Sequence, residues 1–171
     1  MIIIAQIFGV LAVVLFFLSF QFKKRGHIIT VNALSRFVYI VQYVLLGAID
    51  GATLDFVGML SSVVAKYKEK LFSKKWGITV PLLFNLLLVA TGIALYENIF
   101  SIFAIAGILL EVNALWITRE KNIRLLSFLA APMWLTYNLG NMAYGSAVGN
   151  VFTMISIIVA FIRYDVKGKE K

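Results

Sequence analysis

Seven apolar runs of 15 to 22 residues, separated by short polar linkers, account for most of the chain. An α-helix needs about 20 residues to cross the hydrocarbon core of a bilayer. Lipid offers the peptide groups no hydrogen-bond partner, so each run must form a helix. The sequence therefore predicts an all-α integral membrane protein with seven transmembrane helices, a class that also fits its 61% content of hydrophobic residues. The runs cover residues 2–22, 28–49, 51–65, 76–95, 99–118, 125–143 and 146–162.

The basic residues predict how the chain is oriented in the membrane. With seven helices, 15 of the 16 Lys and Arg residues fall on one side, whereas the opposite linkers carry only the acidic Asp50 and Glu97. Basic residues are retained on the cytoplasmic side, so we expect the N-terminus outside and the C-terminus in the cytoplasm. The net charge of +8 then follows from topology and is no sign of nucleic-acid binding. The 15 residues are Lys23, Lys24, Arg25, Lys66, Lys68, Lys70, Lys74, Lys75, Arg119, Lys121, Arg124, Arg163, Lys167, Lys169 and Lys171.

A weak internal repeat relates the two halves of the chain. A shift of 98 residues aligns the first three predicted helices with the last three, and it places Gly47 on Gly145 and Tyr39 on Tyr137. One helix lies between the halves, so both have the same orientation and form a 3+1+3 parallel repeat. The predicted units are a first three-helix repeat (1–67), a basic loop with a linker helix (68–97), a second three-helix repeat (98–165) and a basic cytoplasmic tail (166–171).

Three charged residues, Arg36, Asp55 and Glu111, fall inside the predicted spans. A charge at the bilayer centre costs about 2.5–3.5 kcal/mol even on the most lenient scale, so such residues usually face a bundle interior or a cavity. Arg36 and Glu111 each lie roughly 12 Å from the basic side at 1.5 Å per residue, so they can meet as an ion pair. Such a pair either fixes the packing of the two halves or gates a substrate or coupling-ion site. Asp55 is either hydrated at headgroup level or part of a polar wall.

The second repeat concentrates the remaining candidates for substrate binding. Trp134 and Tyr137 are three residues apart, so they share one helical face. They either pack in the core or form a stacking surface for a ring-shaped or cationic ligand. Asn138 and Asn150 each need a hydrogen-bond partner in an apolar setting, which either a neighbouring helix or a solute can supply. Pro132 interrupts the hydrogen-bond ladder of its helix and predicts either a static kink or a hinge.

These residues carry a resemblance to known families. The segment from Trp134 to Tyr137, followed by Asn150, resembles the W-x-x-Y segment and later Asn of the SWEET and SemiSWEET sugar transporters, members of the PQ-loop (MtN3-like) group. The resemblance implies that Trp134 and Asn150 line a central substrate pocket. In the first repeat Arg36 stands where the second has Trp134, and Ala52 where it has Asn150, so the pocket is not symmetric.

Over its full length the chain resembles the YgjV-type bacterial inner-membrane proteins. The similar stretches include residues 32–34, residues 45–48 and the basic loop after the first span. This resemblance implies a multi-pass protein of the bacterial cytoplasmic membrane. The Pro-Gln dipeptide that typifies the PQ-loop group is absent from the chain.

The remaining function classes are narrowed by what the sequence lacks. There is no Cys and a single His, so we expect no metal site, and no Gly-rich phosphate loop or paired nucleophile predicts an enzyme or a cofactor. We expect a SWEET-like secondary carrier or facilitator that moves a small polar solute by alternating access. The alternative is a non-transporting seven-helix receptor or interaction protein. Predicted partners are a small-molecule solute and the lipid bilayer, and both a monomer and a homodimer remain open.

Overall fold

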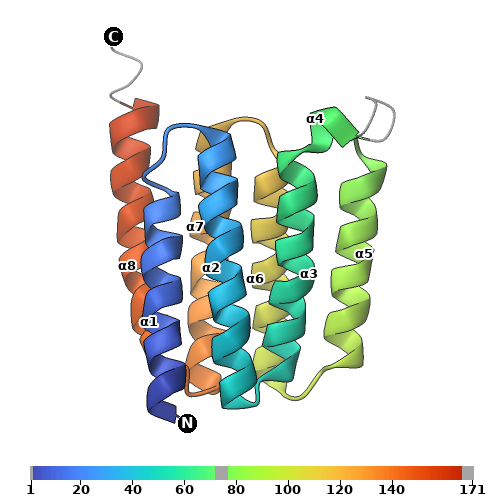
Figure 1. The fold of residues 1–171 in the computed structure, drawn as a ribbon, viewed down its shortest axis with the longest axis vertical. Coiled ribbons are helices and arrows are strands. Elements are labelled where there is room, and N and C mark those ends of the chain that lie inside the picture. Colours follow the sequence, from blue (N-terminus) through green and yellow to red (C-terminus); the bar gives the residue numbers. More distant parts are fainter. Residues whose placement is uncertain (1, 72–76, 167–171) are drawn as a thin grey trace.

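A computed structural model describes residues 2–71 and 77–166 of the chain, and every regular element in these ranges is a helix (Figure 1). Within these ranges seven helices have 16 or more residues. A short helix lies between the third and the fourth of them, and a short π-helical segment follows the last. They are α1 (Ile2–Ser19), α2 (Arg25–Leu46), α3 (Ile49–Lys66), α4 (Lys68–Leu71), α5 (Thr79–Ala94), α6 (Ile99–Trp116), α7 (Glu120–Gly140), α8 (Tyr144–Phe161) and η2 (Ile162–Val166).

Each of the seven predicted runs overlaps one of the long helices, with ends that differ by a few residues. The largest difference is at α7, which begins at Glu120, five residues before the apolar run. The prediction followed apolar content alone, whereas a helix continues into the membrane surface as long as its backbone hydrogen bonds persist. Parts of three predictions lie outside the described residues, namely the helix start at Trp76, the loop residues Lys74 and Lys75, and the tail from residue 167 onward.

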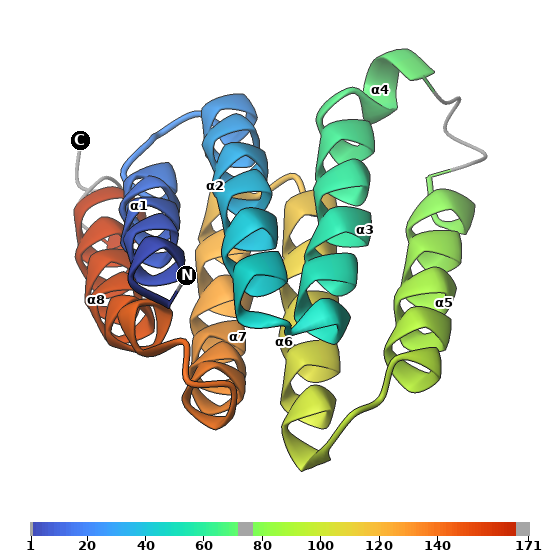
Figure 2. The same ribbon diagram turned by 60° about the horizontal axis from the view of Figure 1, so that its bottom comes forward.

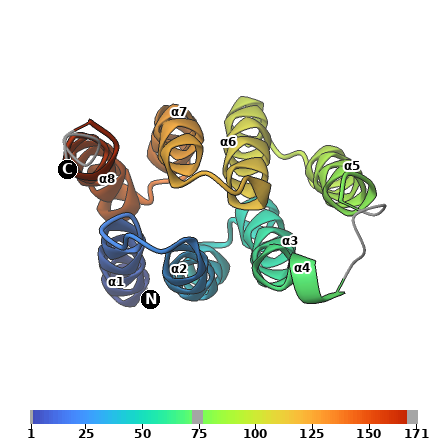
Figure 3. The same cartoon turned by 90° about the horizontal axis from the view of Figure 1, so that it is seen from above.

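The long helices form two layers of three, seen end-on in Figure 3. One layer runs α1, α2, α3, and the other runs α8, α7, α6. The layers touch along α1 with α8 and along α3 with α6, while α2 and α7 face each other at the centre. Helix α5 packs against α3 and α6 at one end of this arrangement (Figures 2 and 3).

Successive long helices run in opposite directions, so the loops alternate between two ends of the bundle (Figure 1). The end we call the basic end holds the α1–α2 loop, α4, the α6–α7 loop and η2; the other end, with the N-terminus, the α2–α3 turn and Glu97, is the acidic end. At the acidic end Gly47 ends α2 with a φ of 78°, a left-handed conformation that glycine adopts without a steric penalty. This tight turn sets α3 directly beside α2.

Polar side chains lie inside the bundle among apolar ones, and many large apolar side chains face outward. Ile78 is 83% exposed, for example, whereas Asp50, Ser61 and Ser62 on α3 are buried beside the hydrophobic core. This broad exposure of large apolar side chains departs from the pattern of a soluble protein and matches a bundle whose solvent is lipid.

Four segments in the described ranges are long and apolar enough to cross a membrane: α1, α2, α6 and Tyr144–Val166. The other three long helices fall outside this set: α3 and α7 carry buried polar residues, and α5 has 16 residues. That these three also span stays a prediction.

Candidate functional site

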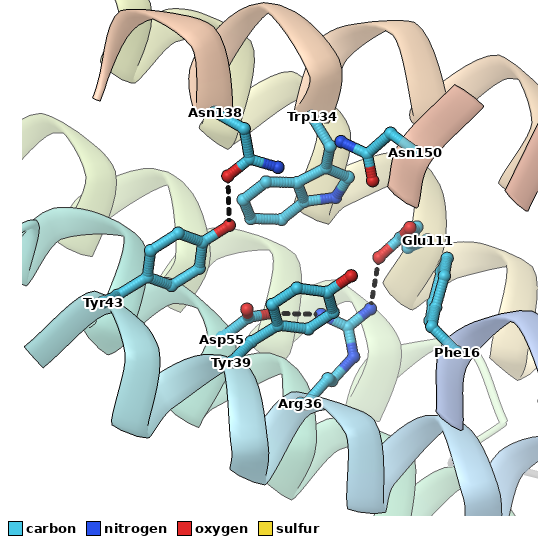
Figure 4. Close-up of a pocket in the computed structure, with 9 residues that line it drawn as sticks. All are labelled: Phe16, Arg36, Tyr39, Tyr43, Asp55, Glu111, Trp134, Asn138 and Asn150. Atoms are coloured by element: carbon cyan, nitrogen blue, oxygen red, sulfur yellow. Dashed lines mark hydrogen bonds and ion pairs between the residues drawn. The ribbon is translucent and has the colours of Figure 1, made fainter. Parts of the chain in front are cut away.

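The centre of the bundle holds a buried cluster of three charged residues from three helices (Figure 4). The guanidinium of Arg36 on α2 donates from Nη1 to Oδ1 of Asp55 on α3 across 2.5 Å, and from Nη2 to Oε2 of Glu111 on α6 across 2.6 Å. Its Nε donates to Oδ1 of Asn32, one turn earlier on α2, at 3.1 Å. Arg36, Asp55 and Glu111 are 1%, 3% and 4% exposed. We call these three residues the charged triad.

The charged triad lines a central cavity between the two layers. Six helices contribute to its wall, and α5 contributes no residue to it. About 20 Å³ is open to the centres of water molecules, enough for about one or two waters and too little for a sugar or an amino acid. The lining residues are Phe16, Arg36, Tyr39, Tyr43, Asp55, Glu111, Trp134, Asn138 and Asn150.

Aromatic rings form one wall of this cavity. Tyr39 and Tyr43 stack with ring centroids 6.1 Å apart, and Tyr43 stacks in turn on Trp134 at 6.4 Å. The Tyr43 hydroxyl donates to Oδ1 of Asn138 at 2.8 Å, which joins α2 to α7 at the centre of the two layers. The wall therefore consists of aromatic rings and a few fixed polar atoms beside the charged triad.

The structure brings together most of the residues that the sequence singled out. Arg36, Glu111, Trp134, Asn138 and Asn150 all line the cavity, and the expected contact between Arg36 and Glu111 is present.

Two of the singled-out residues need comment. Of the two interpretations open for Asp55, hydration at headgroup level does not hold, because Asp55 is buried, bonds to Arg36 and lines the cavity as part of a polar wall. Tyr137 is absent from the cavity lining, because its hydroxyl donates to Asp50 Oδ1 at 2.6 Å toward the acidic end. Its ring packs edge-on against Trp134, with centroids 5.8 Å apart, behind the wall.

The asparagines of the second half of the chain differ in whether their side chains find a hydrogen-bond partner. Asn113 forms a reciprocal pair with Asn85 that joins α6 to α5, at 2.9 and 3.0 Å, and Asn141 donates to the Tyr137 carbonyl. By contrast the amide nitrogen of Asn150, a residue 5% exposed, has no hydrogen-bond partner among the described residues. A buried amide without a partner is costly, and a solute or water in the cavity can supply one.

The sequence prediction missed three lining residues, Phe16, Tyr39 and Tyr43. A usable signal existed for two of them: Tyr39 and Tyr43 follow Arg36 by three and seven residues, the spacing of a single helical face. For Phe16 the signal was weaker, because the nearest polar residue that shares its face on α1 is the single Ser19, three residues later.

A family model described as Imp-YgjV, bacterial inner membrane protein, matches residues 3–167 of the chain. The chain belongs to the Imp-YgjV family. The match covers all seven long helices, so this is a membrane protein of a bacterial inner-membrane family. No curated protein and no solved structure matches it.

Two arginines of this Imp-YgjV chain tie its layers together at the basic end. Arg25, at the start of α2, donates to the carbonyls of Ala65 on α3 and of Leu115 and Ile117 at the end of α6. Arg124 on α7 donates to Oδ2 of Asp165 in η2 at 2.8 Å, and to the Phe22 carbonyl after α1 at 3.2 Å. Each arginine thus bridges both layers, one along α3 and α6 and the other along α1 and α8.

Polar bonds close the acidic end of this Imp-YgjV bundle in the same way. Asp50 at the start of α3 accepts from the hydroxyls of Ser101 on α6 and Tyr137 on α7, at 2.7 and 2.6 Å. Gln6 on α1 donates to the carbonyl of Met142 in the α7–α8 turn and accepts from the amide of Gly145 at the start of α8. The cavity therefore lies between two sets of bonds that cross between the layers.

Proposed function

We propose that this protein is a small carrier that moves a polar solute across the bacterial inner membrane through its central cavity. The observation that carries the proposal is the charged triad at mid-height of the bundle, lining a cavity that both layers enclose. Ionisable residues within membrane spans are expensive and mark substrate or ion pathways more often than packing sites. The unpartnered amide of Asn150 in the same wall supports a bound solute.

The proposed mechanism is alternating access. We interpret the two layers as the two three-helix repeats of a 3+1+3 arrangement, with α5 as the linker helix. In this reading, α1 corresponds to α6, α2 to α7 and α3 to α8, and the contacts of α1 with α8 and of α3 with α6 correspond to each other. One repeat then rocks against the other about the central site. All seven long helices span, with the basic end in the cytoplasm and the N-terminus outside.

The enclosed cavity represents an occluded state in this proposal. A solute larger than one or two waters needs the layers to part at one end, and the bonds of Arg25 and Arg124 or those of Asp50 and Gln6 then break. Pro132 lies two residues before Trp134 on α7 and supplies a proposed hinge, because it leaves one backbone carbonyl of the helix without its donor. The resemblance to SWEET proteins supports Trp134 and Asn150 as the first solute contacts, with Asn138 and Arg36 beside them.

The experiment that tests this function combines binding and flux on the same purified protein. Sugars, small carboxylates, amines and nucleosides are screened by thermal stability, since a ligand at 100 times its Kd stabilises a fold by about 2.7 kcal/mol. Each hit is then followed as a radiolabelled solute in proteoliposomes. We expect Asn150→Ala to abolish both the stabilisation and the flux. Asn141→Ala is the matched control, because Asn141 lies outside the cavity lining.

Two results would overturn the proposal. Saturable binding without flux supports the alternative of a membrane receptor that does not transport. Flux that is unchanged in both Asn150→Ala and Trp134→Ala removes the central cavity as the pathway.

A further inference from the structure

The charged triad contains one more negative charge than positive. Asp55 and Glu111 are both carboxylates when ionised, and Arg36 is their only ion-pair partner among the described residues. Arginine keeps its proton in proteins, so a fully ionised triad has a formal charge of −1. The Born cost of leaving one ion uncompensated in a low dielectric, after relaxation, is several kcal/mol.

Among the residues that the structure describes, no other charged side chain lines the cavity to balance this excess. Helix α2 contributes Arg36, Tyr39 and Tyr43, α3 contributes Asp55, and α6 contributes Glu111. The residues that line the cavity from α1, α7 and α8 are Phe16, Trp134, Asn138 and Asn150, none of which ionises. A positive charge must therefore come from outside the described side chains.

The small volume of the cavity limits what can supply this positive charge in the conformation that the structure shows. About 20 Å³ takes a water molecule but no organic ion. A proton needs no volume of its own, and two carboxyl groups that share one arginine can hold one proton between them. The closed state is then neutral, with one carboxylate and one carboxylic acid on either side of Arg36.

The wall of the cavity indicates what replaces the proton when the site opens. Tyr39, Tyr43 and Trp134 present stacked rings next to the carboxyl groups. Aromatic faces attract cations, Trp most strongly, and a desolvated cation–π contact adds to the attraction of a carboxylate. An anionic solute would meet aromatic faces and a site that already has an excess of negative charge.

Resting on the carrier function proposed above, we propose that the central site takes up a monovalent organic cation of the ammonium type in exchange for one proton held by Asp55 and Glu111. The exchange balances: one cation enters, the O–H bond of one carboxylic acid breaks, and its proton leaves to water on the open side. The site is neutral before the exchange, when the triad holds the proton, and after it, when the ionised triad of charge −1 holds the cation.

The first measurement tests the proton without any solute. In infrared spectra of the purified protein, the carbonyl stretch of a carboxylic acid is separate from the bands of a carboxylate. We expect one such band that disappears in Glu111→Gln and equally in Asp55→Asn, because either variant leaves a neutral Arg–carboxylate pair. Asp50→Asn is the matched control and keeps the band, since Asp50 is a buried carboxyl bonded to Ser101 and Tyr137 outside the cavity lining. A spectrum with no such band, or a band lost only in Asp50→Asn, contradicts the proposal that Asp55 and Glu111 share a proton.

The second measurement tests the exchange. Methylammonium, tetramethylammonium and choline are titrated into weakly buffered protein with a pH-indicator dye, and 3,3-dimethylbutanol serves as the uncharged isostere of choline. We expect at least one cation to stabilise the protein and to release about one proton per bound cation, with no effect of the isostere. Release is absent in Glu111→Gln. If no cation in the series binds, or if the isostere binds as well as choline, the proposal that the site takes an organic cation is wrong.

These outcomes separate the two proposals. Proton release on cation binding without flux in proteoliposomes leaves the exchange site in place and removes the carrier. Flux of a neutral or anionic solute that Asn150→Ala abolishes keeps the carrier and removes the cation.

Discussion

Arg36 and Glu111 are 75 residues apart in the sequence, yet the Arg36 Nη2 and Glu111 Oε2 atoms lie 2.6 Å apart at the centre of the bundle. The bond joins α2 of one layer to α6 of the other, and the bond to Asp55 joins α2 to its neighbour α3. One guanidinium therefore holds three helices. This geometry makes the loss of the arginine a different event from the loss of either carboxylate.

The first prediction concerns this asymmetry. Arg36→Met leaves the buried carboxyl groups of Asp55 and Glu111 without their cation, and we expect it to lower the free energy of unfolding by about 3–5 kcal/mol. Glu111→Gln or Asp55→Asn leaves one intact pair, so we expect a loss of about 1 kcal/mol. Thermal unfolding in detergent measures both. Arg119→Met is the control, because Arg119 is exposed and outside the bundle interior.

A triple variant separates a structural role of the charged triad from a functional one. Arg36→Met, Asp55→Asn and Glu111→Gln together remove all three charges, and we expect this protein to unfold closer to wild type than Arg36→Met alone. A triple variant that is stable but binds no solute shows that the charges are kept for binding. If it is the least stable of all the variants, the triad is needed for packing.

The second prediction concerns the bonds at the basic end. Arg124→Ala removes the bonds to Asp165 and to the Phe22 carbonyl, so the layers should part more often at this end. The chain contains no Cys, so Asn150→Cys places a single reporter in the cavity. We expect a membrane-impermeant maleimide to label it about tenfold faster from the basic side in Arg124→Ala, since loss of about 1.4 kcal/mol raises the open population by that factor. Lys23→Ala, which removes an exposed charge at the same end, should leave the rate unchanged. An equal acceleration in both variants would show that net charge, and not the bond, controls access.

The sequence predicts the helices of this fold well, because a backbone surrounded by lipid has to satisfy its hydrogen bonds within each helix. Apolar runs mark where helices lie. Their ends are less exact: α7 continues into polar residues at Glu120, and α2 stops at Leu46, three residues before its apolar run ends, because Gly47 turns the chain. The order of helices within the layers has no such signal, since an apolar face on α1 packs equally well on many partners.

The candidate site was predictable only in part for the same reason. The equal predicted depth of Arg36 and Glu111 indicated that they can form an ion pair, because charges inside a membrane need a partner. Depth says nothing about rotation around a helix axis. The sequence therefore left open whether Asp55 is hydrated or part of a polar wall, and whether Tyr137 packs in the core or faces a ligand; the bonds to Arg36 and to Asp50 decide where each side chain lies.

The third prediction tests the close contact between α1 and α8. A Cβ at Gly149 would overlap the side chain of Val13, whereas one at Gly26 would meet open space. We expect Gly149→Ala to lower the free energy of unfolding by about 1–3 kcal/mol through overpacking. Gly26→Ala should stabilise α2 by about 0.5–1 kcal/mol, because alanine loses less backbone freedom in a helix. Thermal unfolding of the two variants compares them directly. If Gly149→Ala is neutral, α1 and α8 are not in tight contact in the membrane.

The last prediction fixes the orientation. Glu97, between α5 and α6, and Lys121, at the start of α7, lie at opposite ends of α6, so they face opposite sides of the membrane if α6 spans it. Both positions accept a cysteine in a chain that has none of its own. Retention of basic residues in the cytoplasm predicts that an impermeant maleimide labels Glu97→Cys in intact spheroplasts and labels Lys121→Cys only after the membrane is opened. The reverse pattern would place the basic end outside, and equal labelling of both in intact spheroplasts would show that α6 does not cross the membrane.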